Sequence, residues 1–562
     1  MEELRLDLSQ IPDEATRQTV VRLLNLVEQL HAQVLALTAE NQQLRDEINR
    51  LKGERGRPLF PAQRPPKAPP PKSGDVSSEA ERHQPQPHQK GAKLDRIGID
   101  RQEFLRVDPA LLPPDAQFKG YEPVVVQDLV VRTDNVLFLK EVYYSPAQQR
   151  SFRAPLPSGY RGEYGPGIRA LAVGLAYSGH MSEAQIHTLF TDVGVLISRG
   201  TVCALLIEGH EPFHAEAAAV LHAGLASSPW QHLDDTPTRV NGQNQVCYVL
   251  CNPLYTHYQT RANKERLTVL SVLQGGAPPH YRLDARGLLY LEAAGVSQKV
   301  RRQLGALVRA RAPDAEWDEA PFLGLLAAAL PRLGPQQRQR ILEAGALSAY
   351  QAQTTVPVVQ TLVCDDAPQF RQLTAAIALC WVHDGRHYAK LLPVLPQHRE
   401  ALAQFRERYW QFYHQLRAYQ GAPTAAEAAR LDAAFDALFG TQTGWEMLDA
   451  RIALTRAKKP ALLAVLQHPE LPLHNNPAEL GVRRRVRKRD VSFGPRTATG
   501  TRAWDTFQTL AATAAKLGVS FYQYLQDRMS GAERLPSLAA RIADRAQGLN
   551  LGQSWTSSST SA

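Results

Sequence analysis

The segment from Val20 to Lys52 carries a heptad repeat, which limits what this part of the chain can fold into. Leucine recurs every seven residues, at Leu23, Leu30, Leu37, Leu44 and Leu51. Three residues before each leucine stand Val20, Val27, Val34, Asn41 and Ile48. β-Branched residues at a, leucine at d and one asparagine at a favour a parallel two-stranded coiled coil, in which the buried amide fixes the register. We therefore predict a leucine-zipper coiled coil over residues 1–52 that joins two copies of the chain. The alternative is a long amphipathic helix packed on its own domain.

Composition sets the next two boundaries. Residues 53–93 hold nine prolines and one aromatic residue. Such a sequence stays extended and cannot bury a core, so we predict a Pro-rich disordered linker. Residues 94–160 contain the segments PVVVQDLVVRT and NVLFLKEVYYS, whose alternation predicts a small strand-containing domain.

Residues 161–225 predict consecutive helices. Ser182 and Ser198 are placed as N-caps, and glycines stand at the expected breaks. A helix, a short turn with glycine and a second helix form the pattern of a helix-turn-helix DNA-binding region. We expect Ser198 and Arg199, at the start of the second helix, among its DNA-binding residues. The alternative is an ordinary three-helix bundle.

Residues 226–530 predict an α/β core with helical insertions at about 275–350 and 398–465. The strand-like segments are WQHLDDTPTRV, QVCYVLCNPLYTHYQT, RLTVLSVLQ and VPVVQTLVC. The second insertion carries an aromatic stripe typical of core packing, at Phe405, Tyr409, Trp410, Phe412 and Tyr413. Residues 531–562 predict a C-terminal tail with a disordered end. The whole is an α/β multidomain chain.

Charge and cysteine content narrow the classes of function. The 562 residues include 64 Lys and Arg against 55 Asp and Glu, and the net charge of +9 favours a polyanionic partner. Five cysteines rule out a disulfide scaffold and fit a reducing cytoplasm. They also lack the spacing of a closed four-ligand site, so we expect no structural zinc. No run approaches ~18 apolar residues, so we expect no membrane span.

Five acidic residues stand where a catalytic site could form. Asp234 and Asp235 end one predicted strand, Asp365 and Asp366 follow another, and Glu479 begins a helix. Sheets of α/β proteins place their sites at strand ends, and three converging carboxylates could hold two Mg²⁺ ions that cleave a phosphodiester. The alternatives are that the paired aspartates start turns and that Glu479 belongs to a capping box.

The densest basic run follows Glu479 and consists of Arg483, Arg484, Arg485, Arg487, Lys488 and Arg489. Beside a candidate metal site this run favours phosphate binding. The alternative is a helix whose charges are partly solvated, with Arg483 paired to Glu479. Cys380, His383 and His387 resemble metal ligands in spacing, but without an HExxH motif we favour packing or supporting hydrogen bonds.

Taken in order, these motifs resemble those of transposases of the insertion sequence sixty-six family, a DDE group with an RNase H-like core. The resemblance rests on ENQQLRDEINRLK, GEYGPGIRALAVGLAYSGHMSEAQIHTLF, LDDTPTRV, LVCDDAPQF, CWVHDGRHY and NNPAE. It covers most of the chain, but residues 274–356 match no part of the family pattern.

By position, the resemblance implies that Asp234, Asp365 and Glu479 are the catalytic carboxylates and hold two Mg²⁺ ions, with Mn²⁺ as a substitute. His383 and Arg386 fall on the family's Cys-Trp-x-His-x-x-Arg signature and would support them. The neighbouring aspartates, one residue after each catalytic one, would face away because side chains alternate along a strand.

The chain departs from the family pattern at three places. The family often has a Cys-rich zinc element before the first strands, and residues 110–155 contain no cysteine. His474 and Leu480 stand where the family usually has Asp and Arg. These departures indicate a divergent branch that keeps all three carboxylates.

The resemblance implies a bacterial DNA transposase in the cytoplasm, associated with the nucleoid. It would bind element ends and target DNA as a homodimer or higher oligomer, cut by metal-dependent hydrolysis and join by 3′-OH strand transfer. Two alternatives stay open: a catalytically silent DNA-binding regulator derived from a transposase, and a structural scaffold built on the zipper.

Overall fold

A computed structural model gives the structure of the protein and describes residues 11–51, 97–310 and 315–557. The predicted linker at 53–93 lies outside the described residues. The end of the tail, residues 558–562, also lies outside them.

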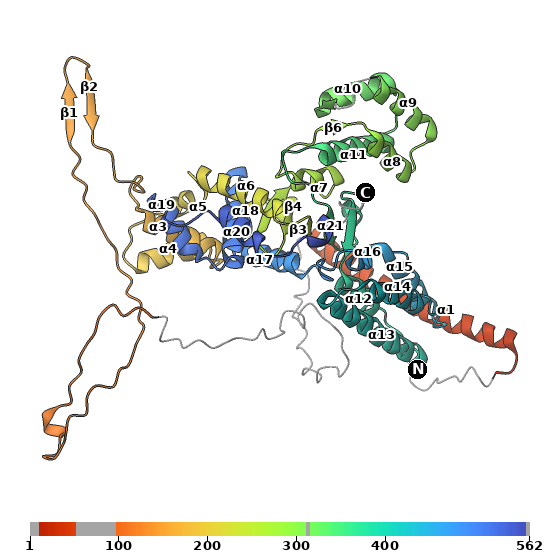
Figure 1. Ribbon diagram of the computed structural model, residues 1–562, viewed down its shortest axis with the longest axis horizontal. Coiled ribbons are helices and arrows are strands. Elements are labelled where there is room, and N and C mark those ends of the chain that lie inside the picture. Colours follow the sequence, from red (N-terminus) through yellow and green to blue (C-terminus); the bar gives the residue numbers. More distant parts are fainter. Residues whose placement is uncertain (1–10, 52–96, 311–314, 558–562) are drawn as a thin grey trace.

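A mixed five-stranded sheet forms the centre of the protein (Figure 1). In the order β5-β4-β3-β8-β9, the first three strands are antiparallel neighbours, and β8 and β9 run parallel to β3. Asn241 and Gly242 join β3 to β4 with φ angles of 49° and 77°, as a two-residue type I′ hairpin requires. The strands are β3 (Trp230–Val240), β4 (Gln243–Cys251), β5 (Thr256–Arg261), β8 (Thr361–Cys364) and β9 (Ala376–Leu379). The predicted mixed α/β fold is confirmed.

One predicted strand is wrong and one strand was missed. RLTVLSVLQ forms α7 (Arg266–Leu273), because Val269, Leu270 and Leu273 recur at helical spacing and pack into the core. β9 holds only the four residues AIAL, too few for an alternation signal. The other three segments contain β3, β4, β5 and β8.

Helices from distant parts of the chain cover both faces of the sheet. On one face, Val249 of β4 meets α17 (Asn476–Ser492) and α18 (Ala498–Lys516). Gly481 permits this close approach, because a Cβ there would lie 2.6 Å from Val249 Cγ1. On the opposite face, Leu233 and Leu250 pack in one core with Val220 of α6 (Glu211–Ala226).

The helices predicted before the core are confirmed. α3 (Pro166–Tyr177), α4 (Glu183–Asp192) and α5 (Arg199–Ile207) precede α6. Ser182 caps α4 in a capping box with Gln185, and Ser198 caps α5 by accepting from the Thr201 N–H. A helix-turn-helix function for these helices stays a prediction. The described part of the C-terminal tail contains two helices, α20 (Leu538–Gln547) and α21 (Gln553–Ser557). α19 (Phe521–Ser530) directly precedes the tail.

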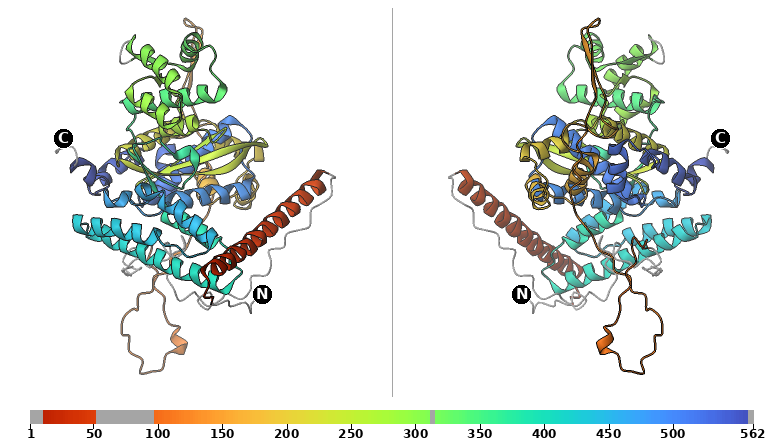
Figure 2. Two further views of the ribbon diagram at one scale, coloured as in Figure 1. Left: turned by 90° about the vertical axis from the view of Figure 1, so that its right-hand side faces the viewer. Right: turned by 90° about the vertical axis from the view of Figure 1, so that its left-hand side faces the viewer.

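Two helical lobes flank the sheet (Figure 2). The helical lobe follows β9 and has an aromatic core that includes Trp381, Tyr409 and Phe412, which confirms that the aromatic stripe packs inside. It consists of α12 (Trp381–Ala389), α13 (Pro396–Gly421), α14 (Ala425–Phe439), α15 (Glu446–Arg456) and α16 (Lys459–Leu462). The insertion lobe, between β5 and β8, consists of α8 (Ala285–Ala293), α9 (Gln298–Arg309), α10 (Glu319–Ala329) and α11 (Pro335–Ala352), with the short strands β6 (Tyr281–Arg282) and β7 (Glu316–Trp317).

The heptad segment forms one long helix, α1 (Glu14–Leu51), which projects from the helical lobe (Figure 2). Glu28 and Asn25 dock α1 onto that lobe. The Glu28 carboxylate accepts from the backbone N–H groups of Val394 and Leu395 at 2.8 Å, and Asn25 bonds to the backbone at Gly444. The heptad side chains lie on other faces and are exposed at Leu23, Val27, Leu30, Val34, Leu37, Leu44 and Ile48. The described part of this chain does not cover them, and the coiled coil stays a prediction. Neither α1 nor any other described helix is long and apolar enough to cross a membrane.

The predicted strand domain at 94–160 is largely absent from the described part of that range. It contains one hairpin, β1 (Val142–Ser145) with β2 (Arg150–Arg153), and no strand over 121–141. Leu129, Val130 and Leu139 are more than 80% exposed, so the alternating pattern has no partner strand among the described residues. Alternation alone cannot form a strand without such a partner.

Candidate active site

The candidate aspartates belong to two neighbouring parallel strands. Asp365 directly follows β8, as predicted, whereas the prediction that Asp234 and Asp235 end their strand is wrong, because β3 continues past them to Val240. β3 pairs with β8 so that His232 stands opposite Val363. Asp234 and Asp365 each come two residues after this pair, so the register places them next to each other on one face. The Asp365 carboxylate accepts from the Ala367 N–H at 3.1 Å, where the chain turns away from β8.

Asp234 lies in a site rich in negative charge. Its side chain is half-buried, and within the described ranges no Lys or Arg pairs with it. Burial is the main reason that the pKa of Asp234 is raised to about 7. The hydrogen bond from the Asp235 N–H lowers this pKa, whereas the negative charges of Asp365, Asp235 and Glu479 raise it further. A carboxyl group among like charges is an electrostatic setting that a bound cation relieves.

Asn475 attaches the helix that carries Glu479 to the strand that carries Asp234. Its Oδ1 lies 2.9 Å from His232 Nδ1, and its Nδ2 donates to the Leu233 carbonyl at 2.9 Å. Its backbone N–H donates to Cys380 Sγ at 3.2 Å. The side chain is fully buried and satisfied at both ends. Sequence reasoning missed this residue, although its place in the Asn-Asn-x-x-Glu motif was a signal.

Glu479 lies in the first turn of α17 and contacts α12. Arg386 Nη2 lies 3.3 Å from its Oε2, and His383 Nε2 lies 3.5 Å from its Oε1. The capping alternative is wrong, because Asn475 is the N-cap and makes no side-chain bond to its own helix. The structure thus brings Glu479 together with the two residues predicted to support it.

The two neighbouring aspartates have different partners. Asp235 forms an ion pair with Lys264 and accepts from Gln369 Nε2 at 3.1 Å. Asp366 pairs with Lys458 at 2.6 Å and with Arg371 at 2.8 Å. These cations neutralise them, whereas Asp234 and Asp365 have no such partner in the described part of the chain.

The chemistry of the three carboxylates fits a hard divalent cation. Mg²⁺ prefers carboxylate and water oxygens, and burial, together with the smaller effect of the charges of Asp365, Asp235 and Glu479, raises the pKa of Asp234. As the side chains stand, no three His, Cys, Asp or Glu residues among those described are gathered closely enough to hold a metal ion.

The basic run of α17 is divided between the protein interior and the surface. Arg485 is fully buried, donates to Gln508 Oε1 at 2.7 Å and Thr260 Oγ1 at 2.8 Å, and pairs with Asp505 at 3.1 Å. Lys488 is also buried and donates to the Met181 carbonyl at 2.7 Å. The predicted DNA-binding role is therefore wrong for Arg485 and Lys488, because they already satisfy groups inside the protein.

The remaining basic residues of α17 stay candidates for DNA contact. Arg483, Arg484 and Arg487 line a pocket beside α17, and Arg489 donates to the Pro237 carbonyl at 2.5 Å. No ion pair joins Arg483 to Glu479 in the described structure, so that alternative is not realised. Ser198 and Arg199 are exposed at the start of α5.

A family model described as "Transposase IS66 family" matches residues 161–282 and 346–503. The chain belongs to this family. The uncharacterized protein y4jO of Sinorhizobium fredii (strain NBRC 101917 / NGR234) is 34% identical over 329 residues, which make up 58% of this chain and 100% of that relative. No solved structure matches the chain.

The IS66 family match contains Asp234, Asp365 and Glu479. Its gap, residues 283–345, corresponds to most of the insertion lobe, in agreement with the segment that resembled no part of the family pattern. Membership of this transposase family implies DNA transposition and DNA binding, and DDE transposases generally use divalent metals.

Proposed function

We propose that this IS66 family member is an active DNA transposase whose catalytic carboxylates are Asp234, Asp365 and Glu479. One observation carries the proposal. The carboxylates of Asp365, after β8, and Glu479, on α17, both act on the carboxyl group of Asp234 in β3, because their negative charges raise its pKa. Among the described residues, lysine and arginine pair with Asp235 and Asp366 but not with Asp234 or Asp365, and Glu479 contacts Arg386. The sheet would then be the RNase H-like core of the enzyme.

The two Mg²⁺ ions, or Mn²⁺ in their place, would activate the attacking oxygen and stabilise the leaving oxygen, and Asp234, Asp365 and Glu479 would hold them. Binding would require the carboxylates to approach one another further than in the present structure. Asn475 would keep Glu479 in reach of β3, and Arg386 and His383 would orient the Glu479 carboxylate. These side chains supply position and electrostatics.

The reaction would proceed in two displacements at phosphorus. In the first, water adds to the scissile phosphate at the element end, and the bond to the 3′ oxygen breaks, leaving a 3′-OH and a 5′-phosphate. In the second, the 3′-OH forms a bond to a phosphate of the target DNA and displaces the 3′ oxygen of the target strand. Neither step forms a covalent bond between protein and DNA.

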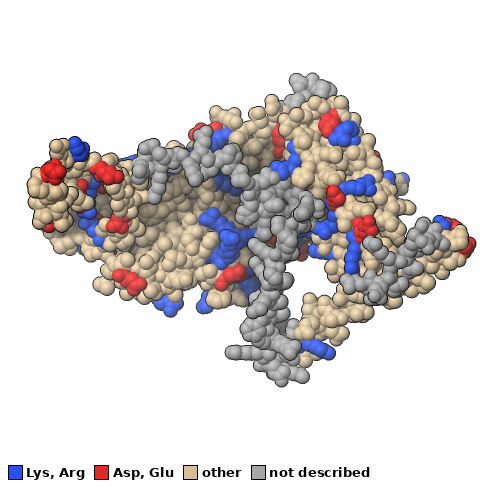
Figure 3. Space-filling view, turned by 90° about the horizontal axis from the view of Figure 1, so that it is seen from below, with Lys and Arg blue, Asp and Glu red and all other residues tan. Residues whose placement is uncertain are grey.

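DNA would be held by exposed basic side chains and by the helices α4 and α5. Lys and Arg side chains gather along a hollowed face of the molecule (Figure 3). Arg483, Arg484 and Arg487 would bind the backbone near the carboxylates, and Ser198 and Arg199 would contact DNA at the start of α5. Two copies joined through the α1 heptad positions would engage two element ends, in the cytoplasm of a bacterium.

A transposition assay tests the proposed function. The DNA flanking the gene should contain inverted repeats, and a marker placed between them should move when the protein is supplied in trans. Movement should disappear with Asp365→Asn.

The second candidate is a catalytically silent regulator. It is favoured by the Arg386 contact to Glu479 and by the absence of a metal-holding cluster among the described residues. End binding without any movement of the marker would support this regulator and contradict the transposase.

A further inference from the structure

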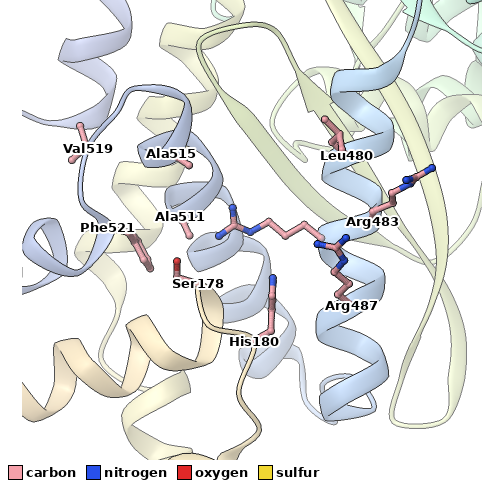
Figure 4. A pocket seen from close by; sticks show the side chains of 10 residues that line it. Ser178, His180, Leu480, Arg483, Arg487, Ala511, Ala515, Val519 and Phe521 are labelled. Carbon is pink, nitrogen blue, oxygen red and sulfur yellow. The ribbon is translucent and has the colours of Figure 1, made fainter. Parts of the chain in front are cut away.

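A pocket beside α17 is lined by side chains other than those of the carboxylate site. It has a volume of about 470 Å³. Figure 4 shows Arg487 on one wall, with His180 after α3 and Ala511 of α18 around the opening. Arg483 lies at the edge and extends outward, and Phe521 closes the apolar side (Figure 4).

The charge of this pocket is uncompensated. Its lining residues include Arg483, Arg484 and Arg487 but no Asp or Glu. In the described structure none of these three arginines takes part in an ion pair. Three guanidinium groups without a carboxylate partner favour an anion, and their planar donors match the oxygens of a phosphate.

Within the described structure, two buried polar atoms of residues that line the pocket lack a hydrogen-bond partner. They are Arg484 Nε and His180 Nδ1. A buried donor that stays unpaired costs free energy, and an oxyanion in the pocket would accept from Arg484 and remove this cost. His180 lines the pocket and adopts a left-handed φ of 60°, a backbone conformation that few residues other than glycine adopt.

The lowered pKa of His180 is consistent with the positive charge of the pocket. Its pKa is lowered to about 4 by burial first and then by Arg484, Lys488 and Arg487 of α17. The ring is therefore neutral at physiological pH, while the arginines keep their charge. The pocket thus carries net positive charge when empty.

The position of the pocket along α17 relates it to Glu479. Arg483 and Arg487 come four and eight residues later, which is about 6–12 Å along a helix rising 1.5 Å per residue. Phosphates of one DNA strand are spaced about 3.4 Å along the duplex axis. A DNA strand that ran along α17 would therefore place the pocket about two to four nucleotides from a phosphate at the carboxylates.

We propose that this pocket is a phosphate site that holds one backbone phosphate of the DNA strand being processed and so sets the strand's register at the carboxylates. The role in register rests on the proposed function, whereas the phosphate site itself does not. The apolar wall formed by Ala511, Ala515, Val519 and Phe521 would contact the adjoining sugar and base.

The test compares Arg484→Gln with Arg496→Gln in the full-length protein. Arg496 is an exposed arginine in the loop after α17 and lies outside the pocket. Binding to element-end DNA is measured without divalent metal at several salt concentrations. We expect Arg484→Gln to weaken binding about tenfold or more and to reduce the salt slope by about 0.9, the value for one phosphate contact. Arg496→Gln should change affinity less than threefold. Equal losses in both variants would overturn the pocket as a specific site.

A second variant, Arg484→Lys, keeps the test decisive if Arg484→Gln does not fold. Arg484→Lys keeps the charge but loses the two-pronged donor, so its affinity should lie between those of wild type and Arg484→Gln. Thermal unfolding identifies any variant that fails to fold, and Arg487→Gln then takes its place. An Arg484→Lys protein that is folded but binds as weakly as Arg484→Gln still supports the site, whereas wild-type affinity in both folded variants would overturn it.

Competition by inorganic phosphate and by a deoxynucleoside monophosphate tests whether the pocket takes its phosphate from DNA or from a free phosphate ion. Both should compete with DNA, and both should lose this effect in Arg484→Gln. Free phosphate that binds wild type without weakening DNA binding would overturn the assignment to DNA. These assays measure binding and need no cleavage. A negative result would therefore overturn the phosphate site without bearing on the proposed catalysis, which is tested by measuring DNA cleavage.

Discussion

His232 Nδ1 lies 2.9 Å from Asn475 Oδ1, and this buried contact ties the N-terminus of α17 to β3. The same amide donates to the Leu233 carbonyl, so one side chain fixes where Glu479 stands relative to Asp234. The site is therefore held by a residue that carries no charge and binds no substrate.

Replacing Asn475 by alanine should disturb the site more than the fold. The change leaves the Leu233 carbonyl and the His232 ring without partners, at a cost of about 1–3 kcal/mol. We expect a folded, less stable protein with normal DNA affinity and strongly reduced metal-dependent nicking. Thermal unfolding, DNA binding and nicking are measured together. Normal nicking would show that Asn475 does not position Glu479.

Arg485 should act on stability rather than on DNA. Arg485→Gln removes one partner of a buried ion pair with Asp505, which costs about 3–5 kcal/mol. Arg487→Gln, two residues on and exposed, should change the unfolding free energy by no more than about 0.5 kcal/mol. Chemical denaturation of the two variants checks this contrast. A stable Arg485→Gln protein with weakened DNA binding would restore the interpretation that we have rejected.

The exposed heptad face of α1 should mediate association. Leu30 and Leu37 are more than half exposed in one chain, while Glu28 is buried against the helical lobe. Changing both leucines to lysine should give a monomer, because two charges cannot be buried at d positions. Analytical ultracentrifugation of the full chain at tens of micromolar measures the outcome. Wild-type protein that sediments as a monomer would contradict the coiled coil.

Stability should fall at acid pH through buried histidines. Burial first, and then Arg261, lower the pKa of His257 to about 3. The unfolded chain binds a proton at His257 below about pH 6.5, but the folded chain does not. Stability is therefore fully present above this pH and is lost as pH falls toward 3, by about 1.4 kcal/mol per pH unit for this residue. Denaturation of His257→Gln between pH 4.5 and 7.5 should show a shallower dependence. An unchanged slope would contradict a neutral buried ring.

Sequence patterns predicted the elements whose signal is local. The Ser182 cap and the heptad helix each depend on residues close in the chain. The strand before Asp365 was also predictable, because an apolar run ends at this residue, whereas the end of β3 at Val240, beyond Asp234, was not predicted. The adjacency of β3 and β8 then followed from parallel pairing, which no single segment specifies.

Contacts between distant segments could not be predicted. The sequence shows six basic residues in seven, but only the packing of α17 on β5 and α18 reveals that Arg485 faces Asp505. The alternation over 121–141 predicted strands because propensity does not report whether a partner strand exists. Asn475 was missed for the same reason, since its partners on β3 lie more than 240 residues away.

Metal-dependent nicking of element-end DNA by Glu479→Gln and Asp235→Asn tests the central claim most directly. Both variants neutralise one carboxylate near β3, but only Glu479 is assigned to the catalytic site. The account predicts that Glu479→Gln loses nicking about a hundredfold or more while it still binds DNA, and that Asp235→Asn keeps most of its activity. Full nicking by Glu479→Gln, or loss only in Asp235→Asn, would contradict the assignment of the carboxylates.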